Sequence, residues 1–198
     1  MGGSSAGVPN VYLRDLRNGR TLAVTTFDRA GGENSVLSPK VSYDGRYVAY
    51  SSSLTPAGRR PAPDQIYRWD RVTGRVVLVS QAPGHERANG FSSRPSISYD
   101  GNRIAFTSNA NDLVAPAPST NEVYVRDVTA GTTEIASVTP DGAPANSGED
   151  ANIQGSVDPA ISGNGRHVVF LSGATNLFEK PERYGGPEVF ARDPAVGG

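Results

Sequence analysis

The chain has 198 residues and a formal net charge of -1, with 19 Lys and Arg against 20 Asp and Glu. This balance argues against the strongly basic surface of nucleic-acid-binding proteins and of proteins held on anionic membranes. There is no cysteine, which excludes disulfides and thiol catalysis, and no apolar run of about 18 residues to span a membrane. Residues 1–7, MGGSSAG, lack the apolar core of a signal peptide and are predicted to be a linker or a remnant of cloning.

Two sequence units alternate along residues 8–198. One unit begins with Val or Ile and then an aromatic residue, and it contains an Asp that is followed four residues later by Gly. This unit occupies 11–24, 66–79, 123–136 and 189–198. The other unit reads PKVSYDGRYVAYSSS, PSISYDGNRIAFTSN and PAISGNGRHVVFLSG, and begins at Pro39, Pro95 and Pro159. Asp-Gly or Asn-Gly between alternating apolar residues predicts a β-hairpin in each copy of this second unit. Each Pro is expected at the first residue of a strand, where its missing N–H is tolerated.

Four strands in each period of about 55 to 66 residues, without helical periodicity, predict an all-β chain of β-propeller blades. We name the four antiparallel strands of a blade a to d, from the central channel outward. The chain then contains strands c and d in a partial blade, two complete blades, and strands a, b and c in a second partial blade. Their ranges are 11–26, 39–79, 95–137 and 159–193.

The repeated units identify a resemblance. The PKVSYDGRYVAYSSS-type copies and the VY-x-RD-x-x-x-G units resemble the TolB-like, WD-repeat-like β-propeller repeat of bacteria across roughly residues 8 to 197. Asn176-Leu177 and Asp112 to Val114 resemble the b–c connector of secreted actinobacterial members. The resemblance implies a propeller fold and a secreted, periplasmic or cell-surface location. The family includes accessory proteins, surface repeats, peptidase propeller domains and a few lyases, but no catalytic motif of its enzymes occurs here, so we expect no enzyme activity.

The number of blades leaves two alternatives open. Propellers typically have 4 to 8 blades, and the 13 predicted strands make a little over three. Two copies related by a two-fold axis could form a six-bladed ring, the number usual for TolB-like proteins, with one c strand per chain left over. The other alternative is that the chain is a segment of a longer propeller.

The long connectors are the predicted place for a ligand. The d–a connectors (27–37, 81–93, 138–157) and b–c connectors (54–64, 109–121, 173–187) emerge on one face, around the channel, whereas the a–b and c–d turns are short. Variable loops on a rigid scaffold commonly carry binding residues. The predicted ligand-binding residues are the charged ones in these connectors: Arg59, Arg60, Asp64, His85, Glu86, Arg87, Glu149, Asp150 and Arg183. The alternative is that they are solvated loop charges.

Several other residues have side chains that could form a metal, catalytic or contact site. His85 and His167 lie in different repeats, so we predict no metal centre, catalytic triad or cofactor. Asn109, Asn111 and Asp112, with Glu149 and Asp150, offer oxygens to calcium but lack the dense acidic spacing of a calcium loop. Trp69 stands where the other repeats have Arg, and is interpreted either as packing between blades or as an exposed contact residue.

These patterns favour a non-catalytic binding or scaffold module that recognises a protein, peptide or glycan on its long-loop face. The first alternative is the accessory propeller domain of a peptidase-type hydrolase whose catalytic domain is absent from this chain. The second alternative is a metal-dependent enzyme acting in the channel. The expected partners are a second copy and such a ligand, with neither nucleic acid nor membrane insertion.

Overall fold

The computed structural model describes residues 9–27, 36–55, 63–85, 87–148, 153–178 and 187–193. Within these ranges the chain forms 13 strands in four antiparallel sheets and no helix, which confirms the predicted all-β fold. Accordingly, the described ranges contain no helix long and apolar enough to cross a membrane. The predicted linker at residues 1–7 lies outside them.

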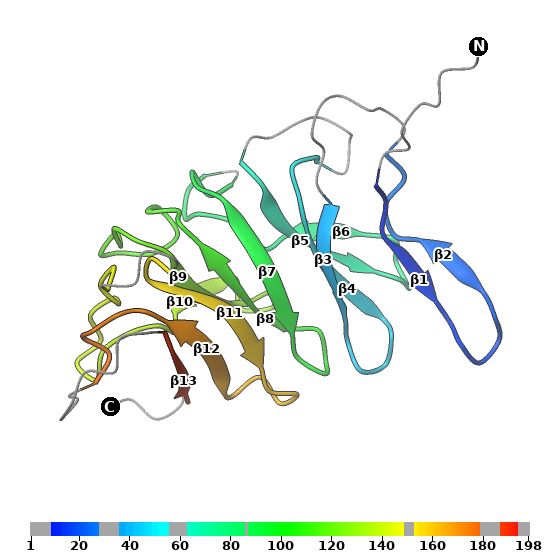
Figure 1. The fold of residues 1–198 in the computed structure, drawn as a ribbon. Helices are drawn as coiled ribbons and strands as arrows, with labels where there is room; N and C mark the ends of the chain where they lie inside the picture. The colour runs from blue at the N-terminus through cyan, green and yellow to red at the C-terminus, as the bar shows by residue number, and fades with distance from the viewer. Residues whose placement is uncertain are drawn as a thin grey trace, which may run out of the picture.

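The sheets follow one another along the chain in an arc, with β1 and β2 at one end and β13 at the other (Figure 1). The first sheet contains β1 (Tyr12–Arg14) and β2 (Thr21–Ala23). The second contains β3 (Val36–Val41), β4 (Tyr47–Ser52), β5 (Gln65–Asp70) and β6 (Val76–Leu78). The third contains β7 (Ser92–Ile97), β8 (Arg103–Ser108), β9 (Glu122–Asp127) and β10 (Thr132–Ile135). The fourth contains β11 (Ser156–Ile161), β12 (Val168–Ser172) and β13 (Glu188–Arg192).

The a–b hairpins of the second, third and fourth sheets are closed by the same set of hydrogen bonds. In the second sheet the hydroxyl of Ser42 donates to Asp44 Oδ1 at 2.7 Å and accepts from the backbone N–H of Tyr47 at 2.9 Å. Gly45 completes this turn with a φ of 68°, a left-handed conformation that Gly adopts without steric cost. The Asp-Gly pattern therefore closes the hairpin through a side chain as well as through the backbone.

The first strand of each complete a–b hairpin differs from expectation. β3, β7 and β11 begin three residues before Pro39, Pro95 and Pro159, so the prediction that Pro starts the strand was wrong. The residue before each Pro has a φ of 53° to 55° and interrupts the register with the second strand. A bulge of this kind leaves one residue out of the ladder. The missing N–H of Pro therefore falls where the ladder is already interrupted.

The core consists of apolar layers between neighbouring sheets. Strands b and c of each larger sheet contribute one stacked aromatic pair, with ring centroids 5.7 to 5.8 Å apart: Tyr50 and Tyr67, Phe106 and Tyr124, Phe170 and Phe190. Trp69 belongs to one apolar cluster with the first of these pairs and with Val11, the residue before β1, so it is a packing residue between blades. Sheet-to-sheet packing therefore fixes the spacing of the connectors at the strand ends.

Candidate functional site

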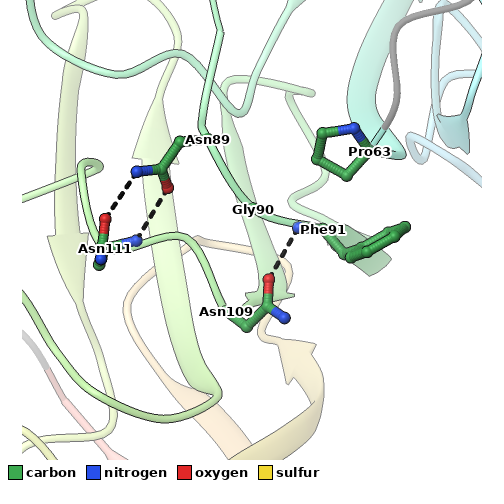
Figure 2. A pocket seen from close by; sticks show the side chains of 6 residues that line it. All are labelled: Pro63, Asn89, Gly90, Phe91, Asn109 and Asn111. Atoms are coloured by element: carbon green, nitrogen blue, oxygen red, sulfur yellow. Dashed lines mark hydrogen bonds between the residues drawn. The ribbon is translucent and has the colours of Figure 1, made fainter.

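The structure describes three of the nine predicted ligand-binding residues, Asp64, His85 and Arg87. The other six, Arg59, Arg60, Glu86, Glu149, Asp150 and Arg183, lie outside the described residues. His85 and Arg87 line one hollow of about 420 Å³ with Pro63, Ala88, Asn89 and Asp112. A second hollow of about 530 Å³ shares Pro63 and Asn89 and is completed by Gly90, Phe91, Asn109 and Asn111 (Figure 2). We call these two adjoining hollows the connector groove.

Asp64 lies beside the groove, next to Pro63, and is not among the residues that line it. It follows Pro63 directly, and its carbonyl oxygen accepts a hydrogen bond from the N–H of Ser92 at 2.9 Å. Of the predicted ligand-binding residues, the structure therefore places His85 and Arg87 together in the groove and leaves Asp64 outside its lining.

The connector that leads from the second sheet into the third is joined to the b–c connector of the third sheet by a set of hydrogen bonds that we call the Asn89–Asn111 clamp. Asn89 Nδ2 donates to Asn111 Oδ1 at 2.6 Å, and the Asn111 N–H donates to Asn89 Oδ1 at 3.2 Å (Figure 2). The Asn89 N–H is shared between both carboxylate oxygens of Asp112, each at 3.1 Å. The clamp holds the d–a connector before β7 against the b–c connector after β8.

The clamp recurs at the next blade. There Asn146 Nδ2 donates to the Thr175 hydroxyl, the Thr175 N–H donates back to Asn146 Oδ1, and the Asn146 N–H donates to Asn176 Oδ1, all at 2.8 to 2.9 Å. The recurrence of Asn at positions 34, 89 and 146 was visible in the sequence, but its partners were not. Asn34 lies outside the described residues.

The same bonds bear on the calcium interpretation. Asn111 Oδ1 and both Asp112 carboxylate oxygens accept hydrogen bonds from Asn89, and Asn109 Oδ1 accepts one from the Phe91 N–H at 2.7 Å. These oxygens therefore already face hydrogen-bond donors. Within the described ranges, no three His, Asp or Glu side chains lie close enough together to share a metal ion.

The floor of the connector groove is tightly packed. A Cβ atom at Gly90 would lie 2.5 Å from the backbone nitrogen of Ala110, so only Gly permits this approach of the two connectors. Beneath it, the buried side chain of Gln65 donates from Nε2 to the carbonyls of Gly90 at 3.0 Å and Ala88 at 3.3 Å. Gln65 Oε1 in turn accepts from the Ser80 hydroxyl at 2.6 Å. The groove is thus supported from below by a hydrogen-bonded carboxamide.

Glu122 replaces this carboxamide in the third sheet. It is fully buried, its Oε2 accepts from the Ser137 hydroxyl, and its Oε1 has no hydrogen-bond partner in the described part of the chain. Burial raises the pKa of Glu122 to about 8, although the Ser137 hydroxyl and the Ala145 backbone act in the opposite direction. Glu122 is therefore mostly protonated at pH 7 and serves in place of the Gln.

The exposed surface of the groove combines apolar contact area with hydrogen-bond donors. The ring of Phe91 is 60% exposed and lies on the same side as Pro63 (Figure 2). The Nδ2 atom of Asn109 points away from the hydrogen bond made by its Oδ1 (Figure 2). The guanidinium of Arg87 adds a permanent positive charge at the adjoining hollow. Such a surface suits a ligand that carries an apolar group beside carbonyl, hydroxyl or carboxylate oxygens.

No protein-family model and no curated protein matches the sequence. Among solved structures, the chain is similar to TolB from Acinetobacter baumannii, with 17% identity and a TM-score of 0.53, over 96% of this chain and 36% of that chain. It is also similar to the tricorn protease, with 13% identity and a TM-score of 0.48, over 80% of this chain and 12% of that chain. For the β-propeller domain of the Trilobed protease from Pyrococcus furiosus the identity is 13% and the TM-score 0.41, over 70% and 33%.

At these identities a structural likeness shows the fold alone, and of the three comparisons only that with TolB has a TM-score above 0.5. The chain spans about a third of the length of TolB. The order of the strands in each sheet agrees with the repeat units predicted from the sequence. The stacked aromatic pairs between strands b and c recur in the same way from sheet to sheet. The chain has the TolB-like β-propeller fold.

Proposed function

We propose that this protein is a non-catalytic binding module that recognises a peptide or glycan segment in the connector groove. The ligand packs an apolar side chain or sugar face on Phe91 and Pro63. Its oxygen atoms accept hydrogen bonds from Arg87 and from the amide groups of Asn109 and Asn111. Because the repeat units resemble those of secreted bacterial propellers, we also propose a secreted, periplasmic or cell-surface location.

The observation that carries this proposal is the Asn89–Asn111 clamp. The two connectors that line the groove are joined by four hydrogen-bond contacts and lie over the buried Gln65, so their geometry is set before any ligand arrives. A preformed site loses less conformational entropy on binding than two free loops would lose. Aromatic and Arg side chains are also the residues that most often dominate binding energies.

A peptide array and a glycan array, each probed with the labelled protein, test the proposal. Binding of the strongest array ligand is then measured by titration calorimetry for Phe91→Ala, Arg87→Ala and Val72→Ala. Val72 is an exposed apolar residue in the short turn between β5 and β6, and it serves as the matched control. We expect each groove variant to weaken binding at least about fivefold, the threshold of roughly 1 kcal/mol for an important contact, with no change for Val72→Ala. Binding that is unaffected by both groove variants would refute the proposal.

A further inference from the structure

The last sheet exposes apolar residues on the face that the interior sheets cover. Val189 of β13 is 71% exposed, whereas Val123, its equivalent in β9, is fully buried. Val169 of β12 is 40% exposed, whereas Ala105, its equivalent in β8, is fully buried. In the third sheet these positions are covered by the neighbouring fourth sheet. The outer face of the fourth sheet therefore has the character of a blade interface.

The first sheet shows the complementary exposure. Tyr12 of β1 is 63% exposed, whereas its equivalent Tyr124 in β9 is fully buried in an interface between sheets. Beside it, Leu37 and Val41 of β3 are exposed, although Ile97, the equivalent of Val41 in β7, packs against the core. This sheet consists of the outer strands c and d only, so the place next to β3 that an a–b hairpin would occupy holds no strand of the described chain.

Each of the two end sheets has the hairpin that the other end sheet lacks. The fourth sheet has the inner hairpin β11–β12, and the first sheet has the outer hairpin β1–β2. β1 and β13 belong to the same sequence unit: Val11 to Asp15 reads VYLRD, and Val189 to Asp193 reads VFARD. β1 of a second copy could therefore pair with β12 in the register that β13 now has. Tyr12 would then lie opposite Phe170, in the place of Phe190.

We propose that two copies of this chain exchange strands at their ends. β12 of one protomer pairs with β1 of its partner, β13 is displaced, and the order β11–β12–β1–β2 forms a complete blade. The β1–β2 hairpin already packs against β4 and β5 of its own chain through Val11 and Val24, so the hybrid blade is docked on one side from the start. Twelve of the 13 strands of each chain are then used, and a two-fold pair closes a ring of six four-stranded blades.

The register of the exchange gives a direct test, because the chain contains no cysteine. Val169 pairs with Ala191 in the single chain, and exchange would bring Leu13 of the partner to that place. Residues directly opposite in an antiparallel pair have Cα atoms about 4.5 to 5.5 Å apart, within the range that a disulfide spans. The single variants Leu13→Cys and Val169→Cys are therefore mixed, oxidised and analysed by non-reducing electrophoresis. The matched control is the double variant Val169→Cys and Ala191→Cys, which reports β13 in its place.

We expect the mixed variants to give a covalent dimer, and the unmodified chain to show twice its 20.8 kDa mass by light scattering. We also expect the control pair to cross-link within one chain much less completely. The proposal is overturned by a single-chain mass at every concentration. It is equally overturned by a dimer in which only the Val169–Ala191 control closes, because that dimer would keep β13 in place. Circular dichroism of each variant confirms that it has kept its β structure.

Discussion

Replacing Glu122 with Gln should stabilise the protein at neutral pH and not at acidic pH. The pKa of Glu122 rises from 4.5 to about 8 on folding because the group is fully buried. Because the pKa of Glu122 is higher in the folded than in the unfolded chain, the free energy of unfolding is unaffected below pH 4.5, the unfolded pKa. It then decreases as the pH rises from 4.5 to about 8. Each pKa unit corresponds to about 1.4 kcal/mol. Keeping Glu122 protonated in the folded protein at pH 7 therefore lowers the free energy of unfolding by at most about 3 kcal/mol.

Gln removes this cost and retains the hydrogen bond with Ser137, as Gln65 does with Ser80 in the preceding sheet. Its Nε2 would face the Ala145 segment, at the positions where Gln65 finds the carbonyls of Ala88 and Gly90. We expect Glu122→Gln to raise the free energy of unfolding by about 1 to 3 kcal/mol at pH 7, within the limit set by the pKa shift. The corresponding gain in Tm is several degrees for a chain of this size.

Urea unfolding at pH 4.5, 6 and 8, followed by circular dichroism, measures this effect. The matched control is the reverse exchange, Gln65→Glu, which should destabilise the protein most at pH 8 and least at pH 4.5. A stabilisation by Glu122→Gln that is the same at all three pH values would contradict the reasoning, because the gain must follow the titration of Glu122. Destabilisation at pH 8 would show that the carboxyl group is needed there as an anion.

Three further changes have definite expected outcomes. Gly90→Ala places a Cβ 2.5 Å from the Ala110 nitrogen and should cost about 1 to 3 kcal/mol of unfolding free energy in a chemical denaturation experiment. Asn89→Ala removes both side-chain bonds of the clamp, so hydrogen exchange should speed up in the connectors before β7 and after β8 and stay unchanged in β4. Two hydrogen bonds from Arg46 hold the pKa of Asp70 well below its usual range, and this stability is present above about pH 4 and lost on acidification. Asp70→Asn should therefore flatten the acid-unfolding curve between about pH 4 and 2, by less than 1 kcal/mol because Arg46 is partly exposed.

Much of the fold follows from local sequence signals. Asp44-Gly45 and its repeats predict the a–b hairpins because the turn conformation is decided by the residues within it. The bulge before Pro39 was not predicted, since a residue other than Gly with a positive φ is held there by the neighbouring strands. Trp69 likewise needed the structure, because its column in the repeat does not say which face of the sheet it occupies.

The groove was predicted less completely. The predicted ligand-binding residues include His85 and Arg87 because both are in a long connector, and the structure places both in the lining of the groove. Asn89 and Asn111 lie 22 residues apart, one before β7 and the other after β8, and the sequence does not reveal that their side chains form a hydrogen bond with each other. Phe91 was not among the predicted ligand-binding residues, because an aromatic residue next to a strand is usually buried in the core. Only the structure shows that its ring is exposed.

Chemical-shift mapping of the backbone amides with the strongest array ligand tests the binding function most directly. We expect the shifted amides to cluster at residues 85, 87–91 and 109–113, with the short turns around Tyr43 and Tyr99 unchanged. Shifts concentrated in those short turns, or spread along the channel strands β3, β7 and β11, would contradict it.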